Sequence, residues 1–109
     1  MRQVSDQIGR AGRKLNTARS ILRVQSPCQM YPTFWEERWS GEVRESYLQR
    51  VIEVSAECAR CPVLEACDEL RRLIDPADPE IRGIVAGELL DTTEQGEWVK
   101  GQLRERNAA

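Results

Sequence analysis

Apolar positions in the N-terminal segment recur alternately four and three residues apart. They are Val4, Ile8, Ala11, Leu15, Ala18 and Leu22. This spacing puts them on one face of an α-helix and predicts a helix near residues 3–24. Gly9 and Gly12 each weaken that helix by about 1 kcal/mol relative to alanine, so it needs a partner surface. Ser26-Pro27 ends it, because proline disfavours helical backbone at the preceding residue.

Two further apolar stripes predict helices in the middle of the chain. The first comprises Val43, Tyr47, Leu48, Val51, Ile52 and Ser55, and it predicts a helix over residues 40–57 with Ser40 as its N-cap. The second comprises Leu64, Cys67, Leu70, Arg71 and Ile74. Its helix is predicted to begin at Pro62, since proline fits the first helical turn, and to end at Asp75-Pro76.

The last third of the chain predicts a turn and one more helix. The segment Gly83–Gly87 is bounded by glycines and apolar between them, which is typical of a turn. A helix is then expected from Thr92 or Thr93 to about Arg106, with Thr92 and Gln95 forming a capping box. Since every periodic segment is helical, the predicted fold class is all-α.

The aromatic residues gather in one short segment between the first two predicted helices. Four of the six, Tyr31, Phe34, Trp35 and Trp39, lie within the ten residues from Met30 to Trp39. Large aromatic side chains dominate both cores and interfaces, so this segment is expected to form one or the other.

The net charge of −2 hides an uneven distribution. Residues 1–23 contain six basic side chains and one acid, a net charge of +5, which leaves −7 for the rest of the 109-residue chain. A basic arm on an acidic body can meet nucleic acid, an acidic protein face or only water. Residues 88–109 carry a net charge of −2, so DNA contact through the C-terminal tail is not expected.

Composition narrows the functional classes. No apolar run approaches the roughly 18–20 residues that cross a bilayer, and the N-terminus does not read as a secretory signal, so a cytoplasmic protein is expected. The chain has no histidine and no phosphate-binding glycine loop, and therefore we do not expect an enzyme.

Four cysteines, Cys28, Cys58, Cys61 and Cys67, are the strongest chemical signal. In a reducing compartment, closely spaced thiols are more often metal ligands than disulfides, and a body this small needs such a staple. Structural zinc sites usually show two tight pairs or include histidine, whereas a 4Fe-4S cluster tolerates one tight pair and a wider gap. The spacing favours a 4Fe-4S cluster, with zinc as the alternative. A helix N-terminus at Pro62 and the adjacent Arg60 would supply positive potential beside the thiolates.

These cysteines carry a family resemblance. A lone cysteine, aromatic residues soon after it, and the segment Cys58-Ala-Arg-Cys61-Pro-Val-Leu-Glu-Ala-Cys67 resemble the WhiB-like iron-sulfur transcriptional regulators of actinobacteria and their phages. The resemblance covers Cys28 to about Gly87. It implies a helical fold around a 4Fe-4S cluster, a cluster sensitive to oxygen or nitric oxide, and binding to the C-terminal region of the primary sigma factor.

The resemblance also suggests which residues meet the partner. The family has a tryptophan in its glycine-bounded turn, where this chain has Val85, so more of the contact is expected on the aromatic segment. The expected partner face comprises Tyr31, Phe34, Trp35, Trp39, Ile84 and Val85. We expect three parts: a basic helix at 1–26, a cluster-binding domain at 27–90 and a C-terminal helix or tail at 91–109.

Two other functional classes remain open. One is a structural metal module, holding zinc or a cluster, that acts as a protein adaptor without a role in transcription. The other is a dithiol oxidoreductase using Cys58 and Cys61, which is disfavoured because such sites are expected in a βαβ setting.

Overall fold

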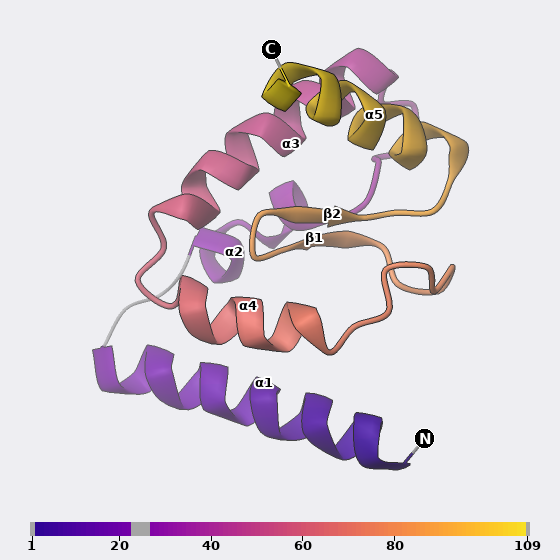
Figure 1. The fold of residues 1–109 in the computed structure, drawn as a ribbon. Coiled ribbons are helices and arrows are strands. Elements are labelled where there is room, and N and C mark those ends of the chain that lie inside the picture. Colours follow the sequence, from indigo (N-terminus) through magenta and orange to yellow (C-terminus); the bar gives the residue numbers. More distant parts are fainter. Residues whose placement is uncertain (1, 23–26, 109) are drawn as a thin grey trace.

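The computed structural model describes residues 2–22 and 27–108, and of residues 2–5, 21 and 22 only the backbone. Helices dominate it, and a β-hairpin lies between α3 and α4 (Figure 1). The elements are α1 Arg2–Leu22, α2 Pro27–Met30, the 3₁₀ helix η1 Pro32–Trp35, α3 Arg44–Ala59, α4 Leu64–Arg72, β1 Gly83–Val85, β2 Glu88–Leu90 and α5 Glu94–Ala108.

The predicted N-terminal helix is confirmed as α1. Ala11 and Leu15, from the middle of its apolar stripe, are buried. Of the described elements, only α4 makes extensive contact with α1, and the two helices lie along one another at one edge of the molecule (Figure 1). The side chains of Val4 and Leu22, and the predicted stop at Ser26, lie outside what is described.

The predicted start of the second helix at Ser40 was wrong. Trp39 to Glu42 form a turn, in which the Glu42 N–H donates to the Trp39 carbonyl at 2.9 Å and Gly41 has a positive φ of 78°. A left-handed residue cannot continue into a helix, so α3 begins only at Arg44, and Val43 at its N-cap makes no side-chain capping bond.

The third helix is also shorter than predicted. Pro62 and Val63 belong to the turn that follows α3, and α4 begins at Leu64 and ends at Arg72, before the predicted stop. A terminal 3₁₀-type bond from the Leu73 N–H to the Leu70 carbonyl closes it.

The glycine-bounded segment is a β-hairpin, so the all-α class holds only as mostly helical. Gly83–Val85 and Glu88–Leu90 pair antiparallel, with Ile84 opposite Leu89. The two turn residues, Ala86 and Gly87, both have positive φ, of 52° and 81°, as a tight two-residue hairpin turn requires. Helical periodicity gives no signal for strands of only three residues.

The C-terminal helix is confirmed as α5, but its cap is Thr93 rather than Thr92. The Gly96 N–H donates to the Thr93 hydroxyl at 3.2 Å, and the hydroxyl in turn donates to Asp91 at 2.6 Å. The predicted capping box was therefore wrong: Asp91 holds Thr93 as the N-cap, and the residue three positions on is Gly96, which has no side chain to complete the box.

The core is formed where α3, the hairpin and α5 meet. Its buried members are Tyr47, Val51, Val54, Cys58, Ile84, Leu89 and Val99. By contrast, α2, η1 and α4 contribute no fully buried residue. Within the residues searched, no helix is long and apolar enough to cross a membrane.

Candidate metal centre

All four cysteines line one cavity. It has a volume of about 200 Å³, and its walls come from α1, α2, η1, α3, α4, β1 and the adjoining turns. The rest of the lining is mainly apolar, including Trp35, Leu64, Leu70 and Ile84. The structure thus brings the distant Cys28 together with the three cysteines of residues 58–67.

Local backbone geometry explains how three of the sulfurs converge. Cys58 lies in the last turn of α3, and the Cys61 N–H donates to the Cys58 carbonyl at 3.0 Å, which folds the chain back on itself. The Cys67 N–H donates to the Val63 carbonyl at 3.0 Å in the first turns of α4. Cys58 is buried, whereas Cys28, Cys61 and Cys67 are half-buried.

Hydrogen-bond donors surround two of the sulfurs. The Trp35 indole N–H donates to Cys58 Sγ at 3.3 Å. The hairpin turn adds backbone donors, with the Gly87 N–H on Cys58 and the Ala86 N–H on Cys67. Donors of this kind stabilise thiolates, the form in which cysteine binds metals.

One cation of the described part of the chain lines the cavity, and it comes from α1. Arg19 lines the cavity and its Nη2 donates to Cys28 Sγ at 3.5 Å. Its Nε is buried and, within the described residues, has no hydrogen-bond partner. The predicted cation was wrong, because Arg60 is 71% exposed and pairs with Glu57.

The pKa values of two cysteines are raised. Burial raises the pKa of Cys58, and the Trp35 and Gly87 donors oppose this only in part. Burial likewise raises the pKa of Cys67, against the Ala86 N–H and the charge of Arg19. A dithiol oxidoreductase has the opposite arrangement, with an attacking cysteine whose pKa is lowered.

The four thiols, the N–H donors and Arg19 face one cavity, so these residues could hold a metal group. Within residues 2–22 and 27–108, no group of three or more Cys, Asp or Glu side chains is arranged to hold one metal ion. A 4Fe-4S cluster takes one thiolate on each of its four irons, and four cysteines line this cavity.

The expected partner residues divide into two groups. Tyr31, Phe34 and Trp39 are exposed, at 57%, 43% and 38% of their surfaces. Trp35 and Val85 are half-buried and line the cysteine cavity, while Ile84 is 5% exposed and belongs to the core. Only the first group offers substantial surface.

Two of the exposed aromatic residues, Tyr31 and Phe34, border a groove that adjoins the cysteine cavity, whereas Trp39 does not line it. Its volume is about 510 Å³, and its lining includes Met30, Tyr31 and Phe34. Glu53 and Glu57 of α3 also line it. Met30 is 51% exposed, so the groove combines apolar surface with two carboxylates.

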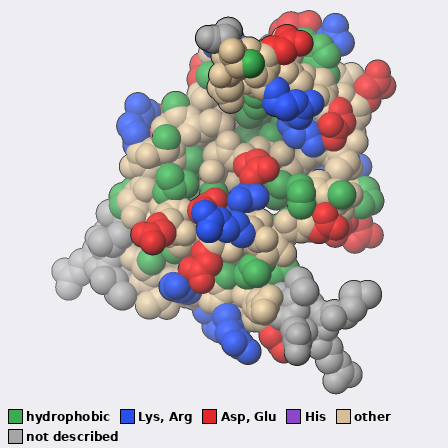
Figure 2. Space-filling model, in the orientation of Figure 1, with side chains coloured by type: hydrophobic (Ala, Val, Ile, Leu, Met, Phe, Trp, Pro, Cys, Tyr) green, Lys and Arg blue, Asp and Glu red, His purple; other side chains and the backbone are tan. Residues whose placement is uncertain are grey.

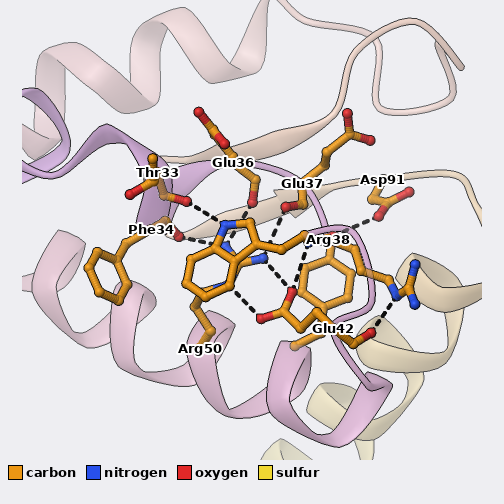
Figure 3. Close-up of polar contacts among 10 residues, drawn as sticks. Thr33, Phe34, Glu36, Glu37, Arg38, Glu42, Arg50 and Asp91 are labelled. Carbon is orange, nitrogen blue, oxygen red and sulfur yellow. Dashed lines mark hydrogen bonds and ion pairs between the residues drawn. The ribbon is translucent and has the colours of Figure 1, made fainter.

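The residue that fixes this segment was missed by sequence reasoning. Arg50, 5% exposed, ion-pairs with Glu42 at 2.8 Å and stacks on the Trp39 ring at 4.3 Å. Its guanidinium also donates to the carbonyls of Phe34, Glu36 and Glu37, as Figure 3 shows. The signal was an arginine at a core-facing position of α3, three residues after Tyr47.

Comparison of the chain with family models, with curated proteins and with solved structures gave no match.

Proposed function

We propose that this protein is a transcriptional regulator of WhiB-like type, which holds a 4Fe-4S cluster on Cys28, Cys58, Cys61 and Cys67 and contacts the C-terminal region of the primary sigma factor. The convergence of all four cysteines on one cavity is the observation that carries the proposal. The aromatic groove beside that cavity supports it.

The cluster would supply a redox-sensitive staple between elements that lack a core of their own. Four thiolates would hold the irons, and the indole of Trp35 and the hairpin amides would stabilise the sulfur charge. The Trp35 indole donates a hydrogen bond to Cys58, and Trp35 follows Phe34 in the chain. A change at the cluster would therefore act on the aromatic segment through the Trp35 side chain.

The sigma contact would fall on Tyr31 and Phe34, with Met30 beside them. Apolar surface bordered by Glu53 and Glu57 fits a partner segment that has apolar anchors and basic flanks. DNA contact is not part of the proposal, since the charged side chains of the described chain that line the groove, Glu53 and Glu57, are both acidic.

Binding to sigma tests the proposal. Phe34→Ala, made anaerobically, is expected to weaken binding of the sigma C-terminal region by about 2 kcal/mol while iron content stays unchanged. Val43→Ala, which truncates another exposed apolar side chain, at 58% exposure, is the control and should bind as the parent does. Trp35→Ala is expected to lose both sigma binding and the cluster, because the Trp35 indole donates a hydrogen bond to Cys58.

If the parent and Phe34→Ala bind sigma equally well, the assignment of the aromatic residues as the sigma-binding surface is wrong. If the chain holds iron and sulfide but does not bind sigma, the structural adaptor becomes the better account.

A further inference from the structure

The long N-terminal helix has no role in the proposed function so far, yet it contributes two side chains to the cysteine cavity. Leu15, 5% exposed, and Arg19 both line that cavity from α1. Among the side chains that the structure describes, no other basic one lines it. The helix therefore stands between the cysteines and solvent on this side.

The contact between α1 and its support is of a kind that can open. Ala11 and Leu15 form its buried part, and an exposed ion pair joins Lys14 to Glu69 at 2.8 Å. A hollow of about 610 Å³ lies between the two helices, and its lining includes basic residues of α1 and, from α4, three acidic residues together with Arg72. Figure 2 shows basic and acidic side chains intermixed on the viewed face of the molecule.

Charge complementarity identifies α4 as the acidic face that the basic helix meets. Glu65, Asp68 and Glu69 of α4 line the hollow opposite Arg10 and Lys14 of α1. Lys14 is paired with Glu69 across this contact, and Arg10 lies opposite the same acidic side chains. This leaves Arg19 as the residue that carries charge to the cysteines.

We infer that α1 is a docked cap over the cysteine cavity, and that Arg19 is a positioning residue whose guanidinium compensates the negative charge of the metal centre. The inference rests on the proposed cluster for its charge argument, but docking of the helix does not require it. The buried Nε of Arg19, which lacks an acceptor among the described residues, supports an additional acceptor within the cavity.

The cap is tested by the rate at which a chelator removes iron from the anaerobic holoprotein. Leu15→Asp places an unpaired charge in the buried contact between α1 and α4. It is expected to speed iron loss about tenfold, because separating the two helices then exposes a charge to water instead of an apolar side chain. Arg13→Gln alters an exposed residue of the same helix and should lose iron at the parental rate. Iron loss from Leu15→Asp at the parental rate would overturn the cap.

A surface variant keeps the test valid if Leu15→Asp does not fold. Lys14→Glu replaces the exposed ion pair with Glu69 by two like charges, and it is expected to speed iron loss up to about fivefold. The double exchange Lys14→Glu with Glu69→Lys should restore the parental rate. Lys100→Glu, which reverses an i,i+3 pair with Glu97 on α5, is the matched control and should have no effect. Equal rates in Lys14→Glu and Lys100→Glu would count against the cap.

The role of Arg19 has its own readout in the midpoint potential of the cluster. Arg19→Gln removes a positive charge beside the centre, so the potential should fall, because reduction adds negative charge. Arg19→Lys should largely retain the parental potential, and Arg13→Gln should not shift it. A potential in Arg19→Gln equal to that in Arg13→Gln would overturn the charge role.

Failure of the cap and failure of the proposed function can be distinguished. Carbodiimide links a lysine to a carboxylate in direct contact, so a Lys14–Glu69 cross-link reports docking of α1 without any cluster. A chain that contains no iron yet forms this cross-link would contradict the cluster and leave the cap standing. Absence of the cross-link in an iron-loaded chain would contradict the cap alone.

Discussion

Arg50 is a charged residue held in a nearly solvent-free position. Within the described residues, its guanidinium donates to acceptors in the segment from Phe34 to Glu42, namely the Glu42 carboxylate and three backbone carbonyls. A buried ion pair contributes little to stability compared with a well-packed apolar pair, but removing one partner leaves the other as an uncompensated buried charge. Arg50 therefore fixes the path of the aromatic segment over α3.

Replacing Arg50 by methionine is expected to destabilise the protein by about 3–5 kcal/mol, because Glu42 and three carbonyls lose their donor. Urea unfolding measures the change. Arg72→Met is the matched control, since Arg72 is 72% exposed and pairs with Asp68 on the surface. The control should change stability by less than about 1 kcal/mol. Similar losses in the two variants would show that Arg50 is not a structural centre.

Two buried carboxylates give stability that depends on pH. Burial favours the neutral form of Glu42, but the Arg50 and Trp39 donors outweigh it and lower the pKa of Glu42. Burial is likewise outweighed at Asp91, where Thr93 and Tyr47 donate and lower its pKa. A lowered folded-state pKa means that the unfolded chain binds more protons in acid. This stabilisation is present above the unfolded values near 4 and is lost as the pH falls through the folded ones.

Glu42→Gln is therefore expected to be less stable than the parent near pH 7 and to approach it near pH 3. The urea midpoints of the two proteins at both pH values measure this difference. A stability difference that does not change with pH would contradict the assignment of a lowered pKa to Glu42.

At the scale of elements, α5 shows how a glycine that weakens a helix can be required by packing. A Cβ on Gly96 would lie 2.4 Å from Asp91 Cγ and 2.6 Å from its carbonyl oxygen. The glycine lets the first turn of α5 approach Asp91, which holds Thr93 and accepts a bond from Tyr47 at 2.6 Å. The close approach links α5 to α3.

Gly96→Ala is expected to destabilise the protein by about 1–3 kcal/mol, because Asp91 must move. Gly101→Ala, in the same helix, meets only the flexible end of Arg104 at 3.8 Å and should stabilise it by up to about 1 kcal/mol. Thermal unfolding of the pair measures both signs. Stabilisation by both substitutions would show that the contact with Asp91 imposes no constraint.

Sequence periodicity predicted the helices that have a clear apolar face and failed where tertiary contacts decide the backbone. The stripe through Leu15 gave α1, which begins at Arg2, one residue before the predicted start, and its predicted end at residue 24 lies outside the described residues. By contrast, the turn at Gly41 delayed α3 to Arg44. The hairpin could not be predicted, because strands of three residues are too short to show alternation. Its function in the site, donating two amides to sulfurs, was equally hidden.

The candidate site was predicted in its residues but not in its surroundings. The spacing and the number of cysteines predicted that Cys28 belongs to the same site as the other three, and all four line the cavity. The partner of Cys28 was not predicted, because an arginine on a basic helix gives no sign that it faces a cavity. Arg19 follows Leu15 by one helical turn, which is the signal that places it beside the buried stripe.

For the whole molecule, two groups of elements differ in what stabilises their packing. The core joins α3, the hairpin and α5, while α2 and α4 have no fully buried residue and meet at the cysteine cavity. Removing the cluster is therefore expected to cost helical structure. Hydrogen exchange should rise in α1, α2 and α4 and stay low in the middle of α3 and α5. Unchanged circular dichroism, melting temperature and exchange in the metal-free chain would contradict this coupling.

The most direct test of the central claim is iron and sulfide analysis, with an absorption spectrum, of anaerobically purified protein and its four Cys→Ser variants. We predict about four iron and four sulfide per parent chain. Each of Cys28→Ser, Cys58→Ser, Cys61→Ser and Cys67→Ser should lose the cluster or hold it only weakly, while Arg72→Met should keep it. Zinc without iron in the parent chain, or full iron, full sulfide and an unchanged spectrum in any one cysteine variant, would contradict a single cluster held by all four cysteines.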